Sequence, residues 1–250
     1  MTMTAFEHTA HRPWPLPRTR WVMAMRWHDV LFAHWPVRPD ILRPLIPRSL
    51  ELDTFDSWAW IGVVPFHMSG VRLRYLPECG CSMAFPELNV RTYVKSAGRN
   101  GVWFFSLDAM NRLAVRLARS WYGLPYYHAR MDVQSDGEHI RYQSTRTHHG
   151  APAAQFEAMY QRLGEIYWAA SGTLDHWLTE RYCLYMVDRQ GRPGYGDIHH
   201  MPWPLQRAEA DIRCNTLTHP LGLELPLEKP VLHFAHQLEV VAWRVQRLGR

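Results

Sequence analysis

The sequence predicts a mainly β fold with a few short helices (α+β), arranged as an antiparallel barrel or sandwich. Two tight-turn signals, Asn100-Gly101 and Asp136-Gly137, each separate a pair of strand-like segments, because these residues tolerate the positive φ of hairpin turns. Helix-like segments are few and do not alternate with strands as in a parallel α/β sheet. A length of 250 residues predicts one domain, 1–250, with a large core.

The composition indicates an ordered chain rich in aromatic side chains. Hydrophobic residues make up 47% of the chain and charged residues 20%, which excludes intrinsic disorder. The 12 Trp, 11 Tyr and 9 Phe residues predict a core or a cavity lined by aromatic rings.

In the first third of the chain, a strand is predicted within residues 21–35. A short helix follows over residues 41–46, because Asp40 can cap its start and a proline ends it. The segment WAWIGVVPFHM is rich in aromatic and β-branched residues and predicts a buried strand that Pro65 should interrupt or bend.

The middle of the chain predicts two hairpins around a helix. The segment FPELNVRTYVK alternates polar and apolar residues and is expected to pair, through Asn100-Gly101, with the segment VWFFSLDA. From Asn111 the apolar residues recur every four positions, which predicts the longest helix of the chain. Residues 126–133 and 139–146 are expected to form the second hairpin.

The last third is less clearly patterned. Residues 155–170 suit a helix or a strand equally, and Thr173 is expected to cap a short helix over residues 174–179. Strands are predicted over residues 181–187, over residues 197–212 with two interrupting prolines, and over residues 239–245.

Several function classes are disfavoured. No apolar run approaches the roughly 18 residues that cross a bilayer, and no secretory signal pattern opens the chain, so we expect a cytoplasmic protein without a membrane partner. The net charge is +5, but its cations are dispersed and only Lys95 and Lys229 are lysine, so no nucleic-acid partner is expected. The sequence leaves the oligomeric state open.

Metal and cofactor motifs are not recognised. The cysteines are expected to be reduced, and the Cys79-x-Cys81 pair lacks further ligands at zinc-site spacing. The histidine pairs His148-His149 and His199-His200, and the spaced pairs starting at His8 and His233, match no metal motif, and no dinucleotide or phosphate loop is present. We therefore expect no metal and no cofactor.

Long segments of the chain resemble a known family. The segments are HRPWPLP, FAHWPV, RPLIP, LELDTFDSWAWIGVVPFHMSG, FPELNVRTYV, GVWFFSLDA, LPYYHA, THHGAP, HWLTERYCLY and DIHHMPWPLQ. They resemble the YqjF-like family of uncharacterised bacterial proteins over nearly the whole chain. That family is in turn distantly similar to the acetoacetate decarboxylase superfamily, which implies a conical β-barrel around a cavity for a small carbonyl compound.

At the position that matches the decarboxylase lysines, this chain has no lysine, which excludes imine chemistry there. In the decarboxylases, adjacent lysines supply the amine of a Schiff base, and the corresponding residues here are 104–108, which contain no lysine. Lys95 lies beside a predicted turn and Lys229 between Glu228 and Pro230, so both are expected to be solvated.

The candidate site is the polar face of the segment FPELNVRTYVK. A period of two places Glu87, Asn89, Arg91 and Tyr93 on one face of a strand. We predict Glu87 as an acid or base and Arg91 as a carboxylate clamp, both catalytic, with Asn89 and Tyr93 binding the ligand. If the face points to water instead, it is an ordinary amphipathic strand.

Ser106 and Asp108 are predicted as further ligand-binding residues, because they lie in the segment that matches the lysines of the decarboxylases. Three functions remain open. The chain could bind a small apolar or carboxylated metabolite in a barrel cavity, act on a small carbonyl or acid substrate by acid/base chemistry without an imine, or be a structural domain with a filled barrel.

Overall fold

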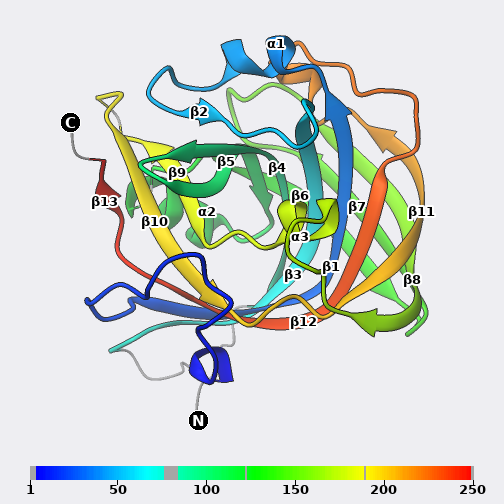
Figure 1. The fold of residues 1–250 in the computed structure, drawn as a ribbon. Helices are drawn as coiled ribbons and strands as arrows, with labels where there is room; N and C mark the ends of the chain where they lie inside the picture. The colour runs from blue at the N-terminus through cyan, green and yellow to red at the C-terminus, as the bar shows by residue number, and fades with distance from the viewer. Residues whose placement is uncertain (1–3, 76–83, 122, 189, 249–250) are drawn as a thin grey trace.

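The computed structural model describes residues 4–75, 84–121, 123–188 and 190–248, and within them the strands form one strongly curved sheet of 13 strands (Figure 1). The strands are β1 (Met23–Val37), β2 (Glu51–Leu52), β3 (Ala59–Leu73), β4 (Phe85–Ser96), β5 (Arg99–Ala109), β6 (Tyr126–Ser135), β7 (His139–Arg146), β8 (Gln155–Tyr167), β9 (Cys183–Val187), β10 (Pro193–His200), β11 (Leu205–Asn215), β12 (Val231–Ala242) and β13 (Gln246–Arg247). The helical elements are α1 (Pro39–Leu42), α2 (Arg112–Trp121), α3 (Leu174–Thr179) and the 3-10 turns η1 (Thr4–Phe6), η2 (Arg43–Leu45) and η3 (His219–Leu221). The mainly β class with few short helices is confirmed.

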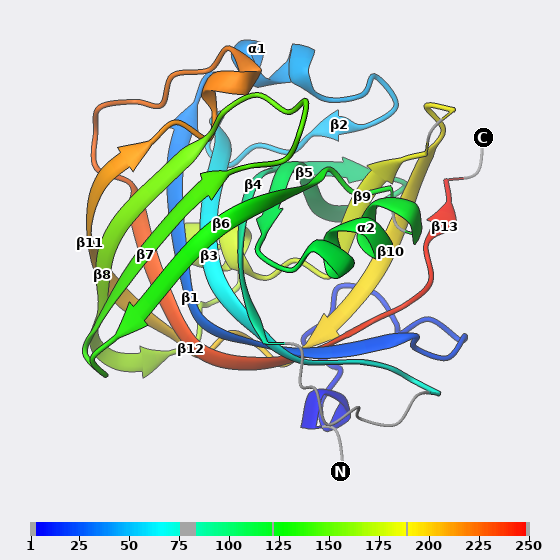
Figure 2. The same ribbon diagram turned by 180° about the vertical axis from the view of Figure 1, so that it is seen from behind.

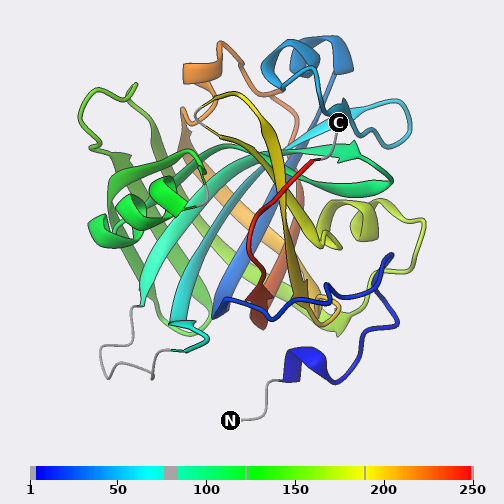
Figure 3. The ribbon, with the colours of Figure 1, turned by 90° about the vertical axis from the view of Figure 1, so that its left-hand side faces the viewer.

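The strand pairings close on themselves in two overlapping circuits among the described strands. One circuit, the large strand ring, runs β5-β6-β7-β8-β11-β12-β1-β3-β4 and returns to β5 (Figure 2). The other, the small strand ring, runs β12-β1-β3-β4-β5-β9-β10 and returns to β12. In Figure 3 the yellow β10 and the red β13 lie side by side. β10 belongs to this small ring, and β13 pairs with β10 without being part of either ring. Most pairings are antiparallel, as predicted, but β5 pairs in parallel with both β6 and β9.

The strands that both rings share have one face in each interior. Alternate residues of β4 pack differently, since Leu88 and Val90 join the core cluster of the large ring while Phe85 joins that of the small ring. A strand buried on both faces is expected to read as a nearly continuous apolar run, which explains the segment WAWIGVVPF. A polar side chain on such a strand is therefore inside the molecule whichever way it points.

The hairpin between β4 and β5 forms, but its turn was predicted at the wrong residues. Ser96 pairs with Arg99, and the turn residues are Ala97 and Gly98, both with positive φ. Asn100 and Gly101 lie within β5 instead. A Cβ on Gly101 would lie 2.6 Å from the backbone oxygen of Cys183, so glycine here allows β9 to approach β5 closely.

Pro65 was predicted to interrupt or bend its strand, and of these two outcomes interruption is wrong, because β3 continues through it. The strand continues because Pro65 lies opposite the irregular stretch of β1 between His28 and Ala33, where the β1–β3 register shifts. A proline, which lacks a backbone N–H, is tolerated where the ladder is already interrupted. The bulge also gives Asp29 a positive φ of 50°.

The remaining elements largely follow the predictions. The ambiguous residues 155–170 contain the strand β8, the region 197–212 contains parts of two strands, β10 and β11, and the last long strand begins at Val231 rather than residue 239. Thr173 caps α3, as expected, and Asn111 accepts hydrogen bonds from the first turn of α2. The predicted helix 41–46 is divided between α1 and the 3-10 turn η2. No described helix is long and apolar enough to cross a membrane.

Candidate functional site

The polar row of β4 points into the small strand ring. Asn89 and Tyr93 are buried there, with exposed fractions of 5% and 0%. Arg91 lies between them and stays only partly buried, although its chain neighbours Val90 and Thr92 have no exposed surface. Part of the Arg91 surface therefore remains accessible to a water-sized molecule.

The Arg91 guanidinium has no acidic partner among the described residues. Its Nη2 atom donates to the Tyr93 hydroxyl and to the backbone oxygen of Leu178, both at 3.3 Å, and its buried Nε atom has no hydrogen-bond acceptor. The guanidinium also lies over the Phe32 ring, 5.3 Å from the ring centre. Its positive charge is thus held by neutral groups alone, an arrangement that leaves capacity for an anion.

A glycine makes room for the neighbouring histidine. Gly62 on β3 pairs with both His34 and Arg91, and a Cβ on it would lie 2.9 Å from the His34 ring. His34 therefore occupies the space above β3, and its Nε2 atom lies 2.6 Å from the Tyr93 hydroxyl. Side chains of β1 and β4 thus meet above Gly62 of β3.

The hydrogen bonds fix the tautomer of His34. The Tyr93 hydroxyl donates to the backbone oxygen of Leu178 at 2.7 Å, so it accepts from His34, whose Nε2 must carry the proton. The Nδ1 atom of His34 then has a free lone pair, and it is buried without a partner. Burial and the nearby charge of Arg91 lower the pKa of His34 well below its usual value, which keeps the ring neutral.

Further polar atoms without partners line the same interior. Buried polar groups in proteins almost always have a hydrogen-bond partner, so an accumulation of such atoms requires an explanation. Atoms of this kind that belong to side chains packed on the small-ring face are Trp27 Nε1, His34 Nδ1, Trp60 Nε1, Asn89 Oδ1, Arg91 Nε, Trp203 Nε1 and His233 Nδ1. Both donors and acceptors are present, as a small polar ligand would need.

Glu87 lies in the same row but at its other end. It lies four positions before Arg91, about 13 Å along the strand, too far for one small molecule to contact both. Its carboxyl group accepts a hydrogen bond from the Tyr126 hydroxyl at 3.0 Å. Burial raises the pKa of Glu87 to about 8, so the group is largely protonated at neutral pH.

Ser106 and Asp108 face the other interior. They pair with Val90 and Leu88, whose side chains belong to the core of the large strand ring. Asp108 forms a bidentate ion pair with Arg146, at 2.8 and 3.0 Å. Burial raises the pKa of Asp108, and the pair with Arg146 opposes that rise. The structure thus brings Asn89, Arg91 and Tyr93 together and separates them from Ser106 and Asp108.

Both lysines lie at the surface. Lys95 pairs with Glu51 at 2.9 Å with 40% of its side chain exposed, and Lys229 lies in the exposed segment before β12. Neither amine reaches the interior row. The Cys79-x-Cys81 pair lies outside the described residues, and elsewhere in the described chain no group of three or more His, Cys, Asp or Glu residues is placed to hold a metal ion.

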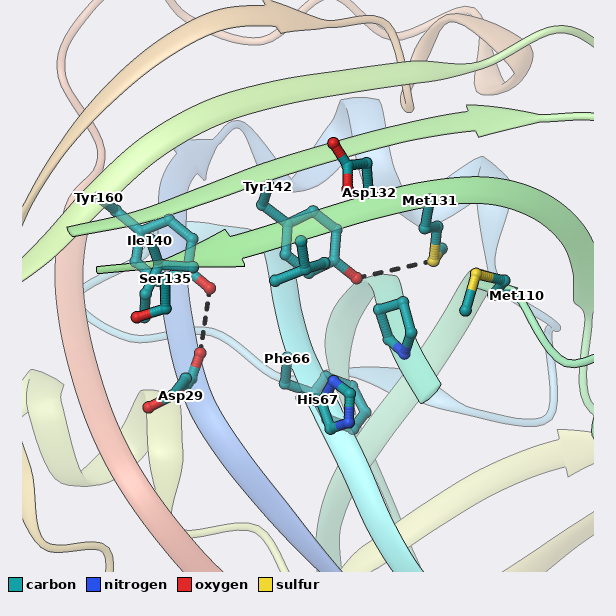
Figure 4. Close-up of a pocket in the computed structure, with 12 residues that line it drawn as sticks. Asp29, Phe66, His67, Met110, Met131, Asp132, Ser135, Ile140, Tyr142 and Tyr160 are labelled. Carbon is teal, nitrogen blue, oxygen red and sulfur yellow. Dashed lines mark hydrogen bonds between the residues drawn. The ribbon is translucent and has the colours of Figure 1, made fainter. Parts of the chain in front are cut away.

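A separate pocket of about 400 Å³ opens at one end of the large strand ring. Tyr142 and Tyr160 project into it from β7 and β8, facing Asp29 and His67 (Figure 4). The Tyr160 hydroxyl donates to the backbone oxygen of Asp29 at 3.1 Å. No lysine or arginine is among the described residues that line this pocket, so these residues offer a carboxylate no countercharge.

His34 and His233 are interior residues that the sequence did not identify as site candidates. His34 lies in FAHWPV, and His233 was considered only as part of a spaced histidine pair. Their proximity to Arg91 depends on strands β1, β12 and β4, which lie far apart in the chain. No spacing in the sequence could have revealed it.

Comparison with known proteins gives a family and a fold. Residues 24–239 match the DUF2071 family, described as an uncharacterized conserved protein. The chain is 47% identical over 232 residues to the uncharacterized protein YqjF of Bacillus subtilis strain 168, covering 93% of this chain and 95% of that protein.

Solved structures with low sequence identity share the fold. The enduracididine biosynthesis enzyme MppR complexed with pyruvate superimposes with a TM-score of 0.60 at 12% identity, over 93% of this chain and 92% of that one. Acetoacetate decarboxylase of Legionella pneumophila gives a TM-score of 0.57 at 12% identity, over 95% and 93% of the two chains. The expected likeness to the acetoacetate decarboxylase fold is confirmed, and at this identity it extends to the fold alone.

Proposed function

The chain belongs to the DUF2071 family, and we propose that it binds a small carboxylate, such as a 2-oxo acid, inside the small strand ring. The observation that carries the proposal is the Arg91 guanidinium, which points into the interior without an acidic partner among the described residues. A planar guanidinium binds a carboxylate through two parallel hydrogen bonds.

The surroundings of Arg91 support a ligand that is both charged and partly apolar. Phe32 beneath the guanidinium and the edge of Trp203, whose ring centre lies 4.9 Å from that of Phe32, provide apolar contact. The unpartnered atoms of His34 and Asn89 provide hydrogen-bonding positions. A related fold binds pyruvate in MppR, which makes pyruvate a suitable first probe.

The test is pyruvate binding measured by ligand-observed NMR and calorimetry, in the wild-type protein and in Arg91→Met. We expect binding to the wild type and at least about 10-fold weaker binding to the variant, because a hydrogen bond to a charged group contributes roughly 1.5–3 kcal/mol. Arg130→Met, which removes an exposed arginine of β6, is the matched control and should bind as the wild type does.

Pyruvamide provides the second control, since it has the shape of pyruvate without the charge. The wild type should prefer pyruvate, and Arg91→Met should lose that preference. Equal binding of pyruvate by the wild type and Arg91→Met, or no binding by either, would contradict the proposal.

A further inference from the structure

His233 of β12 lies in the same interior as Arg91, and nothing in the mechanism of carboxylate binding uses it. Its side chain is fully buried, and it pairs directly with Phe32 across the β1–β12 ladder. Residues directly opposite on antiparallel strands point to the same face. His233 therefore flanks the phenyl ring over which the Arg91 guanidinium lies.

An acid holds His233 in one orientation. The Nε2 atom lies 2.9 Å from Oδ1 of Asp175, a residue in the first turn of α3. The other carboxylate oxygen of Asp175 accepts from the Tyr167 hydroxyl at 2.9 Å and pairs with Arg207 at 3.1 Å. The carboxylate is thus fixed from three sides.

The pairing leaves one ring nitrogen of His233 available. Nε2 lies 2.9 Å from the ionised Asp175, which can only accept, and 3.4 Å from Nη1 of Arg207, which can only donate. The shorter contact with the carboxylate decides the tautomer, so Nε2 carries the proton and Nδ1 carries a lone pair. That Nδ1 atom is buried and has no hydrogen-bond partner. A carboxylate that orients a neutral imidazole, with the opposite nitrogen free, is the arrangement of a general base.

Electrostatics agree with this assignment. Burial lowers the pKa of His233 although Asp175 acts to raise it, so the imidazole is neutral at pH 7. Burial acts to raise the pKa of Asp175, but His233, Tyr167 and Arg207 together lower it, which keeps the carboxylate ionised. His34 also has a free ring nitrogen, but its other nitrogen is held by a neutral phenol rather than by a carboxylate.

The α3 helix contacts both His233 and Arg91. Asp175 at its start holds His233, and the backbone oxygen of Leu178 near its end accepts from Arg91 and Tyr93. In Figure 1 this helix lies near the middle of the view, in front of the strands of the sheet. The Arg91 guanidinium lies over the Phe32 ring of β1, and His233 is opposite Phe32 on the next strand, about 5 Å away, so we expect a three-carbon acid to fit between them.

We propose that His233 is the general base of an enzymatic proton transfer, acting on a 2-oxo acid whose carboxylate is bound by Arg91, with Asp175 as its positioning residue. The inference rests on the proposed carboxylate binding. Nδ1 of His233 takes a proton from the carbon beside the carbonyl. The C–H electron pair forms the C=C bond of an enolate, and the carbonyl π pair moves to oxygen. Return of a proton to the same carbon restores the acid, so nothing is oxidised and no further reactant is consumed.

The experiment is deuterium incorporation into the methyl group of pyruvate in D₂O, followed by ¹H NMR with the purified full-length chain. We expect the wild type to exchange the methyl protons faster than buffer alone. His233→Gln should lower the accelerated exchange rate at least about 100-fold, the usual contribution of a general base. Its pyruvate affinity should stay within about threefold of the wild type, since Arg91 is unchanged.

His236→Gln is the matched control, because His236 is on the same strand with a side chain 63% exposed. It should exchange at the wild-type rate. Asp175→Asn keeps the imidazole of His233 but removes the carboxylate that orients it. We expect this variant to bind pyruvate and to exchange its methyl protons at least about 10-fold more slowly than the wild type. If His233→Gln does not fold, Asp175→Asn decides the question by the same two measurements.

The outcomes separate this inference from the proposal on which it rests. Binding of pyruvate without accelerated exchange in the wild type would overturn the role of His233 and leave carboxylate binding standing. Wild-type exchange in folded His233→Gln would overturn it as well. Failure of the wild type to bind pyruvate at all would remove both proposals together.

Discussion

Arg146 in the large strand ring and Arg91 in the small strand ring differ in the partners of their charge. In the large strand ring, Asp108 and Arg146 neutralise each other through a bidentate pair. In the small strand ring, Arg91 is held by a phenol, a backbone oxygen and an aromatic face, without a carboxylate among the described residues. A paired charge needs nothing more from its surroundings, whereas an unpaired one is costly unless a ligand supplies the partner. The difference therefore separates a structural arginine, Arg146, from one suited to binding, Arg91.

The largest effect that tests this contrast is on stability. Asp108→Asn should lower the free energy of unfolding by about 3–5 kcal/mol, because it leaves the Arg146 charge buried without its partner. Arg91→Met should change it by less than about 1 kcal/mol, since no ion pair is broken. Urea denaturation followed by tryptophan fluorescence measures both.

A double variant tests whether the stability loss in Asp108→Asn comes from the unpaired charge of Arg146. Asp108→Leu combined with Arg146→Met replaces the pair by apolar side chains and should recover most of the lost stability. A loss in Arg91→Met as large as that in Asp108→Asn would show that the two interiors do not differ in this way.

The contrast between the interiors also explains what the sequence could predict. Alternation along β4 predicted correctly which residues share a face, because side-chain direction in a strand is a local property. It could not tell that both faces are buried, since that depends on β4 being common to two closed circuits of strands. The candidate set therefore combined Asn89 and Arg91 with Ser106 and Asp108, which belong to different interiors.

Local signals failed where a distant strand decided the outcome. Asn100-Gly101 has the composition of a hairpin turn, but Gly101 is needed where β9 passes close to β5. Pro65 has the composition of a strand breaker, but the bulge in β1 accommodates it. His233 carried no signal at all, because its partner Asp175 lies almost 60 positions earlier, at the start of a helix.

Glu87, a buried acid of the small ring that lies away from Arg91, should make the free energy of unfolding depend on pH. Its folded pKa of about 8 lies above the ordinary 4.5, so between these pH values the folded state keeps a proton that the unfolded state has lost. Stability from this group is therefore full below about pH 4.5, falls as the pH rises to about 8 and is then constant. Glu87→Gln should abolish this fall, a difference of a few kcal/mol between pH 5 and pH 8.

Chemical denaturation at several pH values measures this effect as the difference between the wild type and Glu87→Gln. Glu138→Gln, an exposed glutamate in the β6–β7 turn, is the control and should leave the pH profile unchanged. A profile of Glu87→Gln parallel to that of the wild type would mean that Glu87 ionises normally inside the protein.

The smallest predicted effect compares one buried hydroxyl from each interior. In the large ring, the Tyr142 hydroxyl donates to the backbone oxygen of Glu87 at 2.8 Å, and in the small ring the Tyr93 hydroxyl contacts Leu178, His34 and Arg91. Tyr142→Phe should lower the free energy of unfolding by about 1 kcal/mol, the net value of one hydrogen bond. Tyr93→Phe should lower it by about 1–3 kcal/mol, because it also leaves the buried Nε2–H of His34 without an acceptor. Only Tyr93→Phe should also weaken pyruvate binding, because it releases the groups that hold Arg91 and His34 in place. Calorimetry on both variants distinguishes the interiors, and equal pyruvate affinity in the two would place the ligand elsewhere.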